Sequence, residues 1–183
     1  MKQGMSQQYE DVYFDEDAIY MERNSRDFRR RIHIINENTE AVCDFLKSQS
    51  FSPSCPSHIV KEVYYPKYTS RANYDKCRNR ALPAGASNFG GLFSVTFTSD
   101  EASRIFFDNL GCHKGPSLGT NFSLACPYTI LAHFAELDWA GAYDVEAGLV
   151  RVSVGVEDKQ KLLAIFQHAL KVAEDVVNAS LQS

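Results

Sequence analysis

The sequence lacks the features that mark membrane, secreted and nucleic-acid-binding proteins. No stretch of its 183 residues approaches the run of about 20 apolar residues that a transmembrane helix needs. The formal net charge is -4, so charge gives no reason to expect an anionic membrane or a nucleic acid as a partner. The opening MKQGMSQQYEDVYFDEDA is polar and acidic, unlike a signal or transit peptide. We therefore expect a cytoplasmic protein with no membrane and no nucleic-acid partner.

Metal, redox and nucleotide motifs are also absent. The cysteines are odd in number and widely spaced, which excludes CxxC motifs and argues against a secreted disulfide framework. Cys112-His113-Lys114 has neither the further ligands of a metal site nor a third group for a catalytic triad. No Gly-rich turn leads from a predicted strand into a helix, so a doubly wound nucleotide fold is excluded. The cysteines, which we expect to be reduced, are Cys43, Cys55, Cys77, Cys112 and Cys126.

What the sequence does contain is the composition of a globular chain, with 44% hydrophobic and 23% charged residues. Apolar residues at helical spacing predict a long first helix that begins near Asp15–Asp17 and ends before Ser48. A T-x-x-E capping box at Thr98–Glu101 predicts the start of another helix. The last helix should open with Glu157-Asp158, which suits the positive end of a helix dipole.

Short strands and turn residues complete the pattern. Its order predicts an α+β fold in which helices cover a small sheet, with the first long helix as a connector or brace. The remaining expected elements are a Ser/Pro-rich loop at 48–58, strands at 59–65 and 91–97, a loop at 66–90 with a short helix near 70–78, a short strand at 122–125, a helix at 128–137 and a strand at 148–155.

The last strand offers one candidate binding residue. Alternation along LVRVSVGVED places Arg151 and Ser153 on the face opposite a row of valines. The planar guanidinium of an arginine in a cleft can hold a carboxylate through two parallel hydrogen bonds. The alternative is a surface arginine paired with a nearby acid. The loop 115–124, GPSLGTNFSL, could approach a ligand closely through its glycines, although an ordinary turn explains it equally.

A run of five arginines lies in residues 22–31, ERNSRDFRRR. A basic run can bind phosphate groups. Glu22 and Asp27 interrupt this one, and an acidic segment at 10–17 precedes it. We therefore interpret it as a helix whose charges pair within the chain or with a partner chain.

Taken together, five segments resemble the cysteine/methionine-metabolism family of pyridoxal-phosphate enzymes, in the family's order. GLVRVSVGVEDKQKLL is similar to its R-[IL]-S-[VIT]-G-[IL]-E-D signature, and SLGTNFSLACP to its S-L-G-x-x-x-S-L-x-x-x-P loop. Within the family the chain most resembles fungal cystathionine γ-synthases, through MERNSRDF and AELDWA. The other matching segments are VKEVYYP, NFGGLFSVTF and ERNSRDFRRRI, in which Arg23 and Arg31 match the arginines of the family's helix.

The resemblance implies a domain organisation. It covers about residues 17–177 and corresponds to the C-terminal domain of the aspartate-aminotransferase-like, fold type I architecture, with a small, mostly antiparallel sheet. We expect an acidic lead-in at 1–16, a linker helix and loop at 17–58 and the C-terminal small domain at 59–183. The family's large cofactor domain is absent from the sequence, and no lysine lies in its [ST]-x-[ST]-K setting. We therefore expect pyridoxal phosphate only in the complete enzyme, not bound covalently by this chain.

The resemblance also assigns roles to three residues. Arg151 matches the arginine that holds the substrate α-carboxylate. Ser117, with the backbone of Leu118, matches the loop serine that orients the catalytic lysine and lines the substrate site. No catalytic, cofactor-binding or metal residue is assigned. Departures from the family pattern, which affect substrate specificity, are Phe122 in place of Glu, Thr120-Asn121 in place of a Gly-bearing pair and Leu131-Ala132 in place of Thr-His.

The implied activity is γ-replacement, in which cysteine is joined to an activated homoserine ester in methionine biosynthesis. Cystathionine γ- and β-lyases share every motif used here, so they remain alternatives. A third alternative is a non-catalytic binding or assembly module derived from this domain. The partners implied are the amino-acid substrates in the complete enzyme, and either a second copy of the chain or a full-length relative.

Overall fold

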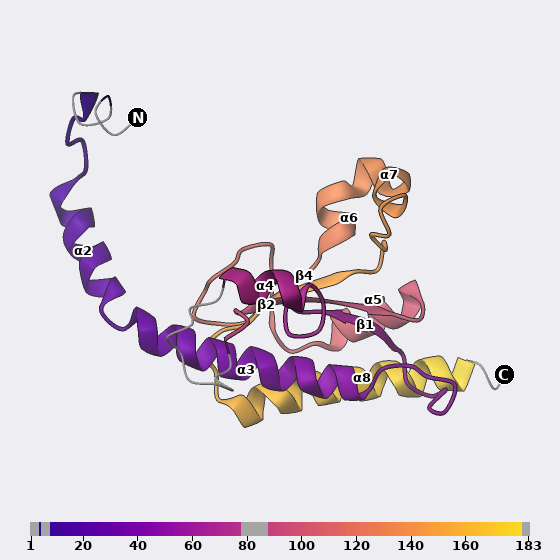
Figure 1. Ribbon diagram of the computed structural model, residues 1–183. Helices are drawn as coiled ribbons and strands as arrows, with labels where there is room; N and C mark the ends of the chain where they lie inside the picture. Colours follow the sequence, from indigo (N-terminus) through magenta and orange to yellow (C-terminus); the bar gives the residue numbers. More distant parts are fainter. Residues whose placement is uncertain (1–3, 5–7, 78–87, 181–183) are drawn as a thin grey trace.

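The structure, a computed structural model, describes residue 4, residues 8–77 and residues 88–180. Within that part of the chain, five strands form one sheet in the order β1-β2-β5-β4-β3 (Figure 1). The strands are β1 (Val60–Tyr64), β2 (Leu92–Phe97), β3 (His113–Lys114), β4 (Leu124–Pro127) and β5 (Val150–Ser153). The helices are α2 (Asp15–Ser25), α3 (Phe28–Ser48), α4 (Arg71–Cys77), α5 (Asp100–Asn109), α6 (Tyr128–His133), the 3-10 helix η1 (Phe134–Glu136), α7 (Leu137–Gly141) and α8 (Lys159–Ser180).

The sheet is mostly antiparallel, as expected. β2 pairs antiparallel with β1 and β5, and β5 with β4, whereas the short β3 pairs parallel with β4. The long helices α3 and α8 run side by side beneath the sheet, and α5 packs against α8 (Figure 1). The predicted α+β fold, with helices over a small sheet, is therefore confirmed.

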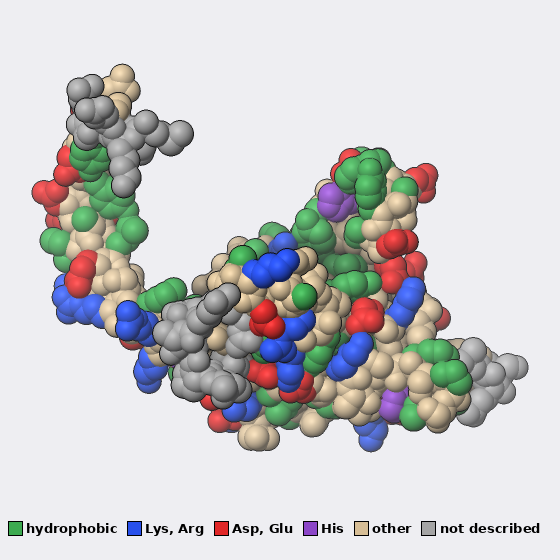
Figure 2. Space-filling model, viewed as in Figure 1, with side chains coloured by type: hydrophobic (Ala, Val, Ile, Leu, Met, Phe, Trp, Pro, Cys, Tyr) green, Lys and Arg blue, Asp and Glu red, His purple; other side chains and the backbone are tan. Residues whose placement is uncertain are grey.

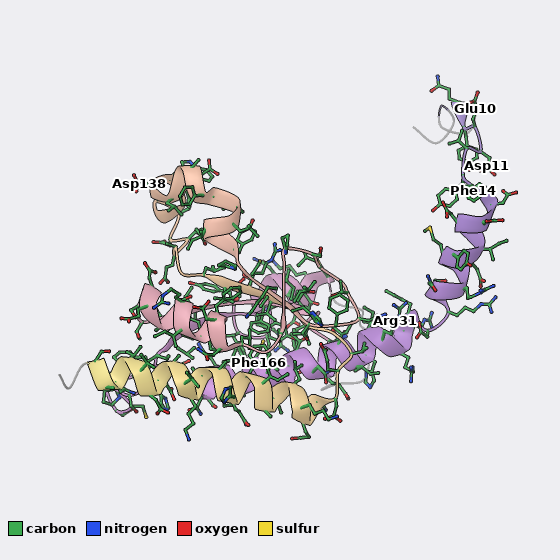
Figure 3. The ribbon with its side chains drawn as sticks, turned by 180° about the vertical axis from the view of Figure 1, so that it is seen from behind. Glu10, Asp11, Phe14, Arg31, Asp138 and Phe166 are labelled. Atoms are coloured by element: carbon green, nitrogen blue, oxygen red, sulfur yellow. The ribbon has the colours of Figure 1, made fainter. Side chains whose placement is uncertain are left out.

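The hydrophobic core lies between the sheet and these helices. Phe93 of β2 is paired with Val152 of β5, and both side chains are buried. The ring of Phe166 from α8, which is labelled in Figure 3, lies 6.1 Å from the ring of Phe93 and 6.3 Å from that of Phe106. Because side chains alternate along a strand, Arg151 points away from this core.

The expected long first helix is two helices. Its ends were predicted closely, but the chain leaves the helix at Arg26–Asp27, between α2 and α3. The Nη2 of Arg31 donates to the carbonyl of Asn24 at 2.6 Å, and the hydroxyl of Ser25 donates to a backbone carbonyl one turn earlier. Such side-chain bonds to the backbone compete with helical hydrogen bonds, which explains the break. α2 buries none of its residues and projects from the body of the molecule (Figure 1 and Figure 2).

Several boundaries differ from those predicted. The N-cap of α5 is Ser99 and not Thr98, since the Ser99 hydroxyl accepts a hydrogen bond from the backbone N–H of Ala102. The strand expected at 122–125 lies at β4, two residues further on, and β3 lies where no strand was expected. The last helix begins at Lys159, after Asp158, whose carboxylate accepts from two backbone N–H groups of the first turn. Residues 78–87 of the expected loop at 66–90, and most of residues 1–7, lie outside the described residues.

The helix expected at 128–137 is α6, η1 and α7 in succession. The backbone leaves the helical region at His133, with φ -128° and ψ 23°, and again at Glu136, with φ -142° and ψ 33°. These two breaks fold the segment into a helical arm, residues 128–143, that stands out from the sheet (Figure 1). Asp138 marks its outer end (Figure 3). None of the helices in the described ranges has the length and apolar character that a membrane crossing requires.

Candidate functional site

Arg151 lies in the middle of the sheet. It is paired with Ser94 of β2 on one side and with Cys126 of β4 on the other. Its neighbours Val150 and Val152 are buried in the core, so its own side chain lies on the opposite face of the sheet. The alternation predicted from the sequence is therefore confirmed.

The guanidinium of Arg151 is held on two sides. Its Nη2 donates a hydrogen bond to the carbonyl oxygen of Pro116 at 2.6 Å. Its Cζ lies 4.7 Å from the centre of the Tyr128 ring. Among the described residues no carboxylate lies within ion-pair distance of it, so the alternative of a surface arginine paired with an acid is not observed. Most of its five N–H donors are left for a ligand.

The loop at 115–123 is fixed against β5 at two points on either side of Ser117 and Leu118. One is the contact between Arg151 and the carbonyl of Pro116. The other is a hydrogen bond of 3.1 Å from the backbone N–H of Gly119 to the hydroxyl of Ser153. Gly119 has φ +73°, a conformation that favours glycine. Ser117 and Leu118 are exposed between these points, so the structure brings the three predicted site residues to one surface.

The second half of the loop rests on the end of β5. The carboxylate of Glu157 accepts hydrogen bonds from both the backbone N–H and the hydroxyl of Ser123. The N–H of Gly155 donates to the same hydroxyl at 3.0 Å. A Cβ on Gly155 would lie 2.6 Å from backbone atoms of Asn121 and Phe122, so only glycine fits there. These roles of Gly155 and Glu157 were not predicted, although the G-V-E-D sequence was the available signal.

The helix α3 is tied to the same region. The side-chain amide of Asn38, which is 2% exposed, donates to the carbonyls of Gly155 and Glu157 at 3.2 and 2.8 Å. The Nη1 of Arg31 donates to the side-chain oxygen of Asn121 at 3.1 Å. Asn38 was missed by the sequence analysis. The signal that could have found it is a polar residue on the apolar face of a long helix.

The remaining candidates are explained by local contacts. The Nζ of Lys114 is held by the carbonyls of Leu110, at 2.8 Å, and Phe107. Burial raises the pKa of Cys112 to about 11, which does not suit a nucleophile. The described part of the chain contains no cluster of three His, Cys, Asp or Glu that could hold a metal ion, and no disulfide joins any of the five cysteines. In the arginine run, Arg26 pairs with Glu22 and Arg31 with Asp27, as expected for a self-paired helix.

Comparison with known proteins identifies related sequences. The model of the Cys/Met metabolism PLP-dependent enzyme family matches residues 11–171. A cystathionine γ-synthase-like enzyme of Amanita muscaria is 52% identical over 183 residues, which cover 96% of this chain and 29% of that protein. The cystathionine γ-synthase of Neurospora crassa is 47% identical over 176 residues, which cover 96% of this chain and 26% of that protein. The chain thus spans less than a third of the length of these relatives.

Solved structures share the fold. The cystathionine γ-synthase of Xanthomonas oryzae pv. oryzae, determined in complex with cystathionine, superposes with a TM-score of 0.67 at 25% identity, over 84% of this chain and 37% of that chain. The cystathionine γ-lyase of yeast superposes with a TM-score of 0.68 at 26% identity, over 82% of this chain and 37% of that chain.

Proposed function

Because the chain belongs to the Cys/Met metabolism family of PLP-dependent enzymes, we propose that it forms the substrate-binding small domain of a longer enzyme of the cystathionine γ-synthase type. In this proposal residues 59–183 are the small domain, residues 17–58 the linker helix and loop, and residues 1–16 a lead-in. Arg151 holds the α-carboxylate of the substrate. Ser117 and the backbone of Leu118 line the same site and orient the lysine that the rest of the enzyme supplies. We place this enzyme in the cytoplasm.

The guanidinium of Arg151 carries the proposal. It lies on an open face of the sheet, beside the loop of Ser117 and Leu118, with no acid to neutralise it among the described residues. Its planar fork matches the two oxygens of a carboxylate, which gives strong, oriented hydrogen bonds. An amino acid held in this way has its remaining bonds in a fixed direction, and such positioning lowers the barrier of the chemical step.

Pyridoxal phosphate, the family's cofactor, supplies an electron sink that stabilises negative charge on the substrate carbon. The described residues of this chain do not fit covalent attachment of that group. Lys114, the lysine nearest in sequence to the loop, directs its Nζ to backbone carbonyls of α5, and Lys67 is paired with Glu40 and Asp44. We therefore propose that the remainder of the longer enzyme holds the cofactor, and that this chain holds only the substrate.

The proposed reaction joins cysteine to an activated homoserine ester by γ-replacement. Similarity to the cystathionine γ-synthases of Neurospora crassa and Xanthomonas oryzae pv. oryzae supports it. The superposition on the yeast cystathionine γ-lyase supports a lyase as the second candidate. Incubation of the complete enzyme with cysteine and an activated homoserine separates the two, since a synthase forms cystathionine and a lyase consumes it. If this region only assembles with a full-length relative, neither reaction depends on Arg151.

The test uses a chimera in which this chain replaces the matched region of the Neurospora crassa relative. Hydrogen bonds to charged groups contribute about 1.5–3 kcal/mol each, so Arg151→Ala should lower kcat/KM about 100-fold or more. Arg151→Lys should also lower kcat/KM substantially, because an ammonium group cannot form the two parallel hydrogen bonds of the planar guanidinium. The absorbance of the bound cofactor should be unchanged in both variants. Near-normal kcat/KM in Arg151→Ala, or loss of the cofactor, would contradict the assignment.

A further inference from the structure

Tyr128 is the first residue of α6 and lies directly beside Arg151. The arginine Cζ is 4.7 Å from the centre of the tyrosine ring, within the range of about 6 Å for a cation–π contact. The backbone N–H of Tyr128 donates to the carbonyl of Leu149 at 3.0 Å, which fixes the start of α6 next to the start of β5. The ring therefore meets the guanidinium from a fixed position.

The helical arm supports the ring of Tyr128 from its other side. The ring of His133 meets that of Tyr128 in an edge-on contact, with centres 5.7 Å apart. The Nδ1 of His133 lies 2.7 Å from a carboxylate oxygen of Glu136, and the ring of Trp139 lies 6.3 Å from that of His133. Arg151, Tyr128, His133 and Trp139 thus form a continuous row of contacts from the sheet into the arm.

An arginine side chain has many rotamers, so an isolated guanidinium on a sheet does not present a defined edge to a ligand. The carbonyl of Pro116 restrains one nitrogen of Arg151, but rotation about that contact would still turn the plane. The ring of Tyr128 packs against the guanidinium, with its centre 4.7 Å from the Cζ, and so hinders that rotation. The two contacts together restrict the orientations open to the guanidinium.

We propose that Tyr128 is a positioning residue for the carboxylate-binding Arg151, and that His133 and Glu136 of the arm hold Tyr128 in place. This inference rests on the proposed function and deepens it. The arm contributes to binding of the amino-acid substrate through the orientation of Arg151, without contact to the substrate.

Steady-state kinetics of the active chimera test the proposal. Tyr128→Leu removes the cation–π contact and should raise KM for the amino-acid substrate about tenfold, with kcat changed less than about threefold. Tyr128→Phe keeps an aromatic face and should stay within about twofold of the parent in both. The matched control is Phe134→Leu, on the same arm, because Phe134 is 75% exposed and makes no ring contact with a described residue. Circular dichroism verifies the fold of each variant, with Tyr128→Met as a second removal of the ring.

Two further measurements separate positioning from a merely structural role. In an Arg151→Ala background, Tyr128→Leu should add less than about a twofold effect, since the group it positions is gone. An amine analogue of the substrate without its α-carboxylate should react equally with the parent and with Tyr128→Leu. Additive losses, equal losses on both substrates, or unfolding of both Tyr128→Leu and Tyr128→Met would overturn the proposal.

The outcomes also separate this inference from the proposed function. If Arg151→Ala impairs the chimera severely while Tyr128→Leu behaves as the parent, only the positioning role is wrong. If Arg151→Ala has no effect, the carboxylate assignment is wrong and the positioning role falls with it.

Discussion

Replacement of Gly155 by alanine should disturb the loop of the candidate site. An added Cβ would lie 2.6 Å from the carbonyl oxygen of Asn121 and from backbone atoms of Phe122. Ordinary contacts of a Cβ begin near 3.4 Å, so the loop backbone would have to retreat by about 0.8 Å. The φ of Gly155 is not in the left-handed region, so the expected effect is steric.

The magnitude follows from that displacement. Overpacking of this kind destabilises by about 1–3 kcal/mol. The retreat would also lengthen the hydrogen bond of 3.0 Å from the N–H of Val156 to the carbonyl of Asn121, which contributes about 1 kcal/mol. For a chain of this size, each kcal/mol lowers Tm by about 2–4 °C, so Gly155→Ala should melt about 5–15 °C below the parent.

Thermal unfolding followed by circular dichroism measures the effect. The matched control is Gly141→Ala in α7, where an added Cβ would meet nothing within 4 Å. We expect that variant to melt with the parent or slightly above it, because alanine is the better helix former. A Gly155→Ala chain that melted within about 1 °C of the parent would refute the close approach of the loop to β5, and with it the placement of Ser117 and Leu118.

Two further predictions concern the buried amide of Asn38 and the partly buried thiol of Cys112. Asn38→Ala should lower the free energy of unfolding, measured by urea denaturation, by about 2–3 kcal/mol, because two carbonyls lose their buried donor. The control Asn178→Ala, on the surface of α8, should have little effect. Equal effects of the two substitutions would contradict the buried hydrogen bonds from Asn38 to Gly155 and Glu157. The pKa of Cys112 is raised from 9.0 to about 11, so the fraction present as thiolate at pH 8 should be about 100-fold lower than for an ordinary cysteine. Its modification by a thiol reagent should therefore be slow in the native chain and fast in denaturant, as measured by peptide mass spectrometry. Rapid labelling of Cys112 in the folded chain would show that partial burial does not raise the pKa of this thiol as described.

Local patterns predicted the elements that depend on periodicity alone. The valine row of β5 indicated which way Arg151 points, because a strand alternates with a period of two whatever lies around it. The apolar stripe of α3 predicted an end before Ser48, and the helix ends at Ser48, because the apolar face of a helix also repeats with a fixed period. The break before α3 was not predictable in this way, since it depends on a hydrogen bond from Arg31 to the backbone of the preceding turn.

The residues of the candidate site were predicted from the sequence, but the contacts that bring them together were not. The resemblance supplied Arg151, Ser117 and Leu118, while their placement depends on contacts between segments more than 30 residues apart in the sequence, such as Gly119 with Ser153. The segment 128–137 was expected as one helix. The structure divides it where the backbone leaves the helical region, at His133 and at Glu136, and no signal in the sequence was found for these two breaks.

Alternate residues of β5 and of the segment that follows it contact the loop at 115–123. Arg151 holds the carbonyl of Pro116, Ser153 accepts from Gly119, and Gly155 and Glu157 both bind Ser123. These four residues occupy every second position of the sequence. The R-x-S-x-G-x-E pattern therefore corresponds to a continuous set of contacts with the loop. A slip of one residue in the pairing of β5 would turn Arg151 and Ser153 toward the core and separate the guanidinium from the loop. The buried valines on the other face oppose that slip, and the same hydrophobic packing that forms the core therefore keeps the binding arginine in register with Ser117 and Leu118.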